Sequence, residues 1–122
     1  MVTLLVGVKT KEQVYPLHLL PKGVNLLVVT EDGSEGKKGL VTDFITEMAA
    51  KADQVFACGP AAMYKAMRKV IGNRPVQVSM EAWMGCGMGA CYACTTLTRQ
   101  GPKQVCQDGP VFELDEILWD NI

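Results

Sequence analysis

Four of the five cysteines lie close together in the sequence and could bind a metal as thiolates. Three of them have the spacing C-x4-C-x2-C, and the fourth follows after eleven intervening residues. They are Cys86, Cys91, Cys94 and Cys106. Four thiolates in this pattern are typical of sites that hold a [2Fe–2S] cluster, in which each iron takes two of them. We therefore expect one four-cysteine metal site.

The residues around the first cysteines have very small side chains. Gly85, Gly87, Gly89 and Ala90 suit a short loop that wraps a cluster, because glycine tolerates positive φ and lets backbone N–H groups approach sulfur. Such N–H groups would stabilise negative charge on the thiolates. The loop composition therefore favours iron–sulfur, and the spacing is that of plant-type ferredoxins.

Structural zinc is the competing interpretation, because zinc also accepts four thiolates. Zinc sites usually use two closely spaced pairs, whereas this sequence contains a single C-x2-C pair. A disulfide scaffold fits less well, because the cysteine count is odd and 48% of the residues are hydrophobic. A zinc-stabilised interaction module without a redox role therefore stays open.

The fifth cysteine, Cys58, is far from the others in the sequence. It ends an apolar run and is followed by Gly59 and Pro60, where a helix is expected to begin. Open α/β sheets bind ligands at such strand ends. The alternative is a small buried hydrophobic residue that caps the strand.

Strands and helices alternate in the first 80 residues. We expect strands at 2–8, 24–30, 53–58 and 76–80, a short helix within 11–20, a loop at 31–39, and helices starting near 41 and near 60. This alternation predicts an α/β fold with buried parallel strands flanked by helices. A hairpin is expected from 95–98 and 104–106. We predict an α/β domain over 1–80 and a cluster-binding domain over 81–122.

Charge and hydrophobicity argue against some partners. The 12 basic and 13 acidic residues are scattered and give a net charge of −1, so no basic stripe could follow nucleic acid. The apolar run at 1–8 is too short to span a membrane and lacks the pattern of a cleaved leader. We expect a cytoplasmic protein with neither nucleic-acid nor membrane partners.

Longer motifs resemble the electron-transfer subunits of class 1B dihydroorotate dehydrogenases. The resemblance is carried by residues 79–94 (SMEAWMGCGMGACYAC) and 105–112 (VCQDGPVF), and by Cys58-Gly-Pro with Met63 in the nucleotide-binding half. It covers nearly the whole chain and implies the ferredoxin reductase superfamily. It also implies that the chain is a C-terminal fragment without the FAD-binding β-barrel and the first strand of the nucleotide-binding domain. The strands beside the missing one would then pair with each other, pair with another chain, or form a homodimer through their exposed edges.

The resemblance further implies a function. A complete subunit would carry electrons from the FMN of a dihydroorotate-oxidising partner subunit, through the [2Fe–2S] cluster, to FAD and then NAD⁺, and the fragment would not be catalytic alone. Cys58, Gly59 and Pro60 would meet nicotinamide. Met84 and Met88 would face the partner, although they could instead be core residues. The alternatives are a gamma-type subunit of a hydrogenase, a sulfide dehydrogenase or a ferredoxin:NADP reductase.

Overall fold

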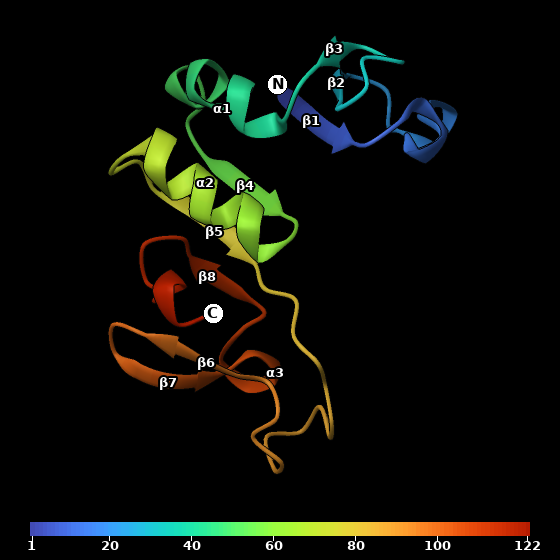
Figure 1. The fold of residues 1–122 in the computed structure, drawn as a ribbon. Helices are drawn as coiled ribbons and strands as arrows, with labels where there is room; N and C mark the ends of the chain where they lie inside the picture. Colours follow the sequence, from blue (N-terminus) through green and yellow to red (C-terminus); the bar gives the residue numbers. More distant parts are fainter. The chain divides into compact units, whose positions relative to one another are not determined.

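The two apolar runs near the N-terminus form parallel strands, as their composition predicts. A computed structural model describes all residues, 1–122 (Figure 1). Strands β1 (Val2–Val8) and β2 (Val24–Thr30) pair along their full length, and β3 (Lys37–Lys38) adds to the other edge of β2. Only β2 supplies fully buried residues to this sheet. The expectation that β1 is buried on both faces is therefore wrong, because this part of the chain has too little helix to cover a three-stranded sheet.

The segment between β1 and β2 does not form one helix. It contains two short 3₁₀ turns, Lys11–Gln13 and Leu17–Leu19, with Pro16 immediately before the second. Proline lacks an N–H group and clashes with the preceding turn of a helix, so a regular helix cannot pass through it. The predicted helix is thus replaced by two separate turns.

The remaining elements follow the predicted order, with one additional strand and two additional short helical segments, α3 and the last 3₁₀ turn. They are α1 (Val41–Ala50), β4 (Val55–Cys58), α2 (Ala61–Ile71), β5 (Val76–Ser79), β6 (Thr95–Thr98), β7 (Gly101–Gln104), α3 (Val105–Asp108), β8 (Val111–Glu113) and a 3₁₀ turn at Trp119–Asn121. Strand β4 is parallel to β5, and β6 and β7 form an antiparallel hairpin. The additional strand is β8, which pairs antiparallel with the free edge of β5.

Apart from the β6-β7 hairpin, the strands are divided between two three-stranded sheets, in the orders β1-β2-β3 and β4-β5-β8. The mixed α/β class with parallel strand pairs is confirmed. By packing, the chain divides into two units, residues 1–45 and 46–122. The division into domains 1–80 and 81–122 stays a prediction. None of the helices is long and apolar enough to cross a membrane.

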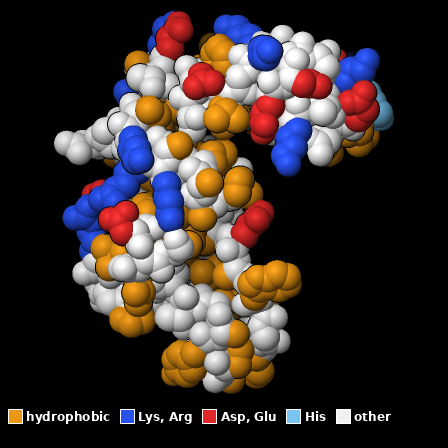
Figure 2. Space-filling view, viewed as in Figure 1, with side chains coloured by type: hydrophobic (Ala, Val, Ile, Leu, Met, Phe, Trp, Pro, Cys, Tyr) orange, Lys and Arg blue, Asp and Glu red, His pale blue; other side chains and the backbone are white.

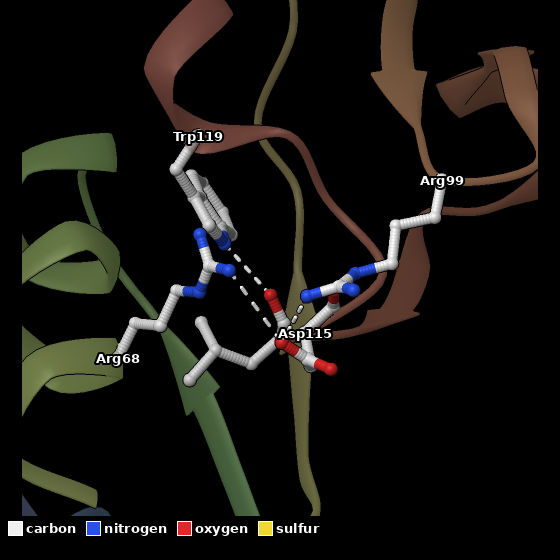
Figure 3. Close-up of polar contacts among 5 residues, drawn as sticks. Arg68, Arg99, Asp115 and Trp119 are labelled. Carbon is white, nitrogen blue, oxygen red and sulfur yellow. Dashed lines mark hydrogen bonds and ion pairs between the residues drawn. The ribbon is translucent and has the colours of Figure 1, made fainter. Parts of the chain in front are cut away.

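The core of the second unit centres on two large aromatic side chains. Trp119 and Tyr64 are each 1% exposed, and their ring centroids lie 5.1 Å apart. The indole N–H of Trp119 donates to the Leu114 carbonyl at 2.7 Å, which satisfies its polar atom (Figure 3). At the surface nearby, Asp115 accepts from Arg99 at 2.9 Å and lies 3.7 Å from Arg68. This core joins α2 to the segment after β8.

Candidate metal centre

The candidate cysteines extend from the sheet of the second unit. The chain leaves β5 and runs without regular structure to β6, and we call residues 81–94 the cysteine loop (Figure 1). At its base, the Met80 N–H donates to the Pro110 carbonyl at 2.8 Å. The ends of the segment that contains the loop and the hairpin are therefore held together next to β5 and β8.

The Cys86 sulfur lies at the centre of a set of backbone donors. The N–H groups of Met88, Ala90 and Cys91 donate to its Sγ at 3.4, 3.3 and 3.4 Å. Hydrogen bonds from Met88, Cys91 and Ala90 lower the pKa of Cys86 to about 6. Because the thiolate is the form that binds metal, the loop favours the metal-binding state of this residue before any metal arrives.

The glycines of the loop are required by space and by backbone conformation. A Cβ atom on Gly85 would lie 2.8 Å from the Cys91 sulfur, too close for a carbon. Gly87 and Gly89 have φ values of +68° and +85°, which side chains other than hydrogen disfavour. The expectation that small residues let the loop fold around sulfur is confirmed. Tyr92, at φ 58°, adopts the same conformation without being glycine.

The other two cysteines meet where the hairpin begins and where it ends. Cys94 is 4% exposed, and its Sγ accepts the Cys106 N–H at 3.4 Å, while its carbonyl accepts the Val105 N–H at 3.1 Å. The Cys106 N–H lowers the pKa of Cys94, whereas the hydrogen bond with the Cys94 side chain raises the pKa of Cys106. The expected strand at 104–106 is wrong in its bounds, because β7 ends at Gln104 and Cys106 lies in α3.

The four thiols therefore form two pairs. The Cys91 N–H donates to the Cys86 sulfur at 3.4 Å, and the Cys106 N–H donates to the Cys94 sulfur at 3.4 Å. No three His, Cys, Asp or Glu side chains gather into a group that could hold one metal ion. A tetrahedral zinc site needs four ligands around one point, whereas a [2Fe–2S] cluster takes two thiolates at each iron. All five cysteines are free thiols. The donor set and its pairing fit the two-iron cluster.

Large apolar side chains lie exposed around the cysteines. Trp83 is 94% exposed, Met88 72%, Tyr92 69% and Met84 50%. Hydrophobic side chains gather at the end of this segment in the space-filling view (Figure 2). The alternative that Met84 and Met88 are ordinary core residues is therefore wrong. Large apolar side chains that are exposed next to one another commonly mark a surface that binds another molecule.

Cys58 lies at the carboxyl end of β4, as predicted, and its side chain is exposed. The alternative of a buried hydrophobic cap is thus wrong. The following turn is fixed by Tyr64, whose hydroxyl accepts the Gly59 N–H at 2.9 Å and donates to the Ser79 carbonyl at 2.6 Å. Pro60 precedes α2 with an extended ψ of 155°, so it is the N-cap and not the first helical residue.

Sequence reasoning did not identify two residues that hold these segments. Tyr64 joins the Cys58 turn to the end of β5, and Gln104 joins the cysteine loop to the hairpin through a hydrogen bond to the Gly89 carbonyl at 3.0 Å. A tyrosine in a helix and a glutamine at a strand end are common, so the sequence alone did not indicate the role of either residue. Both depend on contacts between residues 15 positions apart.

The chain is similar to known electron-transfer proteins along most of its length. Residues 81–118 match the family described as the iron-sulfur cluster binding domain of dihydroorotate dehydrogenase B. Over 96% of the chain it is 41% identical to the dihydroorotate dehydrogenase B (NAD(+)) electron transfer subunit of Geobacillus sp. (strain WCH70), covering 47% of that protein. Over 95% it is 39% identical to the probable counterpart of Thermococcus kodakarensis, covering 48%.

A solved structure shows the same fold. It is a chain from a study of flavin-based electron bifurcation by the NADH-dependent reduced ferredoxin-NADP oxidoreductase. That chain is 30% identical, with a TM-score of 0.79 over 98% of the present chain and 45% of its own length. The chain spans about half the length of the curated relatives it matches. By sequence, the chain is similar to dihydroorotate dehydrogenase B electron transfer subunits, and its residues 81–118 match the iron-sulfur cluster binding domain of that enzyme.

Proposed function

We propose that this chain is the iron–sulfur part of an electron-transfer subunit of an NAD-linked dihydroorotate dehydrogenase in pyrimidine biosynthesis. The observation that carries the proposal is the pairing of four free thiols, through backbone hydrogen bonds to sulfur, inside the residues that match the iron–sulfur family. The ligands are Cys86, Cys91, Cys94 and Cys106. When bound, a [2Fe–2S] cluster supplies one-electron transfer between carriers that exchange electrons in pairs.

The chain's own groups prepare this site. Backbone N–H groups stabilise thiolate charge at Cys86, and Gly85 leaves the space that the Cys91 sulfur occupies. Cys94 is buried, and the fully buried Val105 beside it keeps water from that side of the site. One pair of thiolates is thus exposed at the loop and the other is held against the hairpin. Proteins set the reduction potential of a cluster through such differences in burial and in hydrogen bonding to its ligands.

The exposed apolar residues support a protein partner at the cysteine loop. Trp83, Met84, Met88 and Tyr92 would contact the FMN-containing catalytic subunit that oxidises dihydroorotate. Methionine and aromatic side chains are enriched where proteins bind each other. Contact at this point would bring the cluster near the partner's flavin. A homodimer of the chain through unpaired strand edges is a further assembly that this proposal allows.

Nucleotide contacts would come from the turn after β4. The complete subunit would bind FAD and NAD, with Cys58, Gly59 and Pro60 placed at the nicotinamide. The position of this turn at the carboxyl end of a parallel strand supports that role. Free thiols suit a reducing compartment, which supports a cytoplasmic location.

A second candidate function is favoured by the solved structure. Its chain comes from an NADH-dependent reduced ferredoxin-NADP oxidoreductase, so the same fold serves electron bifurcation there. A gamma-type subunit of such an enzyme, of a hydrogenase or of a sulfide dehydrogenase would use the same four cysteines with a different partner. The two candidates differ in the protein that reduces the cluster.

Metal analysis and electron paramagnetic resonance test the proposal. The anaerobically prepared chain should contain two irons, absorb visible light and give a rhombic signal after reduction. Stoichiometric zinc without iron, even after anaerobic reconstitution, would show a structural zinc module instead. Adding the complete FMN subunit with dihydroorotate should reduce the cluster. Reduction by ferredoxin but not by that subunit would favour the second candidate.

A further inference from the structure

Gln104 connects the two halves of the cysteine site. It is the last residue of β7 and directly precedes α3, which carries Cys106. Its side-chain Nε2 donates to the Gly89 carbonyl at 3.0 Å, across 15 residues of sequence. Apart from contacts with the cysteine sulfurs, this is the only hydrogen bond between residues 85–91 and residues 101–108. Besides contacts with sulfur, one side chain thus holds the tip of the loop to the hairpin.

The bond acts on a peptide group that itself faces a thiolate. The Gly89 carbonyl belongs to the same peptide unit as the Ala90 N–H, which donates to the Cys86 sulfur at 3.3 Å. A hydrogen bond to the carbonyl polarises the unit and strengthens the bond that its N–H donates. It also fixes the plane of the peptide, so the N–H stays directed at sulfur. Gln104 therefore reaches Cys86 through a single peptide group.

The backbone of Gln104 is held firmly enough to act in this way. Gln104 pairs with Thr95 in the hairpin, and its N–H donates to the Asp108 carboxylate at 2.7 Å. The side chain is partly buried, and Gly89 packs so closely that a Cβ atom there would lie 3.3 Å from Oε1 of Gln104. A glutamine anchored at its backbone and confined at its amide loses little further entropy on making the bond.

We propose that Gln104 is a positioning residue for the cluster, acting through the Gly89–Ala90 peptide on the Cys86 thiolate. This inference rests on the proposed function, since it concerns a cluster held by the four cysteines. Removing the donor would loosen the hold of the hairpin on the loop tip and weaken the hydrogen bond from the Ala90 N–H that stabilises charge at Cys86. The bound cluster would then be lost faster and would be harder to reduce, because reduction adds negative charge.

Two variants and a matched control test this inference. Gln104→Leu removes the amide, and Gln104→Glu keeps the length of the side chain but replaces the donor by an acceptor. Gln100→Leu makes the same change in the turn of the same hairpin, at an exposed side chain that donates no hydrogen bond. All are reconstituted anaerobically as the full 122-residue chain. The readouts are the rate of bleaching in air and the midpoint potential from a titration followed by paramagnetic resonance.

Both Gln104 variants should bleach about fivefold faster, the effect of losing one hydrogen bond, and should have lower midpoint potentials. Gln100→Leu should match the unaltered chain in both. Unchanged bleaching and potential in Gln104→Leu would overturn the inference, as would an equal change in Gln100→Leu. Failure of the unaltered chain to assemble any cluster would overturn the proposed function as well. A cluster in the unaltered chain with no effect of either variant overturns this inference alone.

Discussion

The cysteine loop and the aromatic core around Trp119 lie in the same unit but are ordered by different interactions. The core is apolar and buried, and hydrophobic burial stabilises it without a ligand. The loop is exposed and is ordered by backbone N–H groups that point at sulfur. The aromatic core stabilises the fold. The cysteine loop forms the site, and its conformation depends on hydrogen bonds to charged thiolates. The comparison predicts that changes in the two regions separate stability from cluster binding.

The largest effect is expected when one paired thiol is removed. Cys94→Ser should abolish retention of the cluster, because serine oxygen is a poor ligand and the partner sulfur of Cys106 is left without its pair. Iron content and visible absorbance measure the loss. Cys58→Ser is the matched control, because Cys58 is a free thiol on β4 outside the loop. Bleaching in the control would mean that the four ligands have been wrongly chosen.

The two tryptophans give a direct test of the core. Trp119→Ala should lower the free energy of unfolding by about 3–5 kcal/mol, since a fully packed aromatic side chain is lost. Trp83→Ala removes the same side chain from a position that is 94% exposed, so the free energy of unfolding should change by less than about 0.5 kcal/mol. Urea denaturation of the chain measures both. Similar losses in the two variants would contradict the division between core and loop.

A smaller effect is expected at the hydroxyl of Tyr64. Tyr64→Phe keeps the ring against Trp119 but leaves the Gly59 N–H and the Ser79 carbonyl without this partner. The free energy of unfolding should fall by about 1–3 kcal/mol. Tyr92→Phe serves as the control, because its side chain is 69% exposed. Equal stability of the two variants would show that Tyr64 acts through its ring alone.

The same residue gives the fold a pH dependence. Burial raises the pKa of Tyr64 above its ordinary value of 10.0, so the unfolded chain loses the phenol proton first. The stability that this group contributes is present below pH 10.0 and is lost as the pH rises through the folded pKa. Urea denaturation between about pH 9 and about pH 11 should show a steeper fall in the unaltered chain than in Tyr64→Phe. Parallel curves would contradict this account.

The smallest effect is expected at the surface ion pairs beside the core. Asp115→Asn weakens the contacts with Arg99 and Arg68 shown in Figure 3, but the Asp115 side chain is 77% exposed. The free energy of unfolding should fall by less than about 1 kcal/mol, and high salt should remove the difference. Asp120→Asn, an exposed carboxylate with no ion pair, is the control. A decrease in the free energy of unfolding as large as that of Trp119→Ala would show that these polar contacts stabilise the fold as much as the aromatic core does.

The sequence predicted the parts of the fold that depend on local pattern. The apolar runs became strands, and Gly87 and Gly89 of the cysteine loop have positive φ values, which glycine tolerates best. The helix before β2 was wrong because Pro16 divides it. Strand β8 was not predicted, because three residues with alternating burial carry little signal until β5 offers them an edge. The pairing of the thiols likewise depends on the hairpin returning Cys106 to Cys94.

The hydrogen bond between Met80 and Pro110 has a consequence for how the site is assembled. It closes the base of the segment that carries all four paired thiols, beside the pairing of β5 with β8. A segment with joined ends can open locally without separating the strands below it, because the entropy of bringing those ends together has already been lost. The tip of the loop could therefore unfold and close again while the aromatic core stays intact. Iron and sulfide would enter a chain that is already folded, and maturation would be a local event.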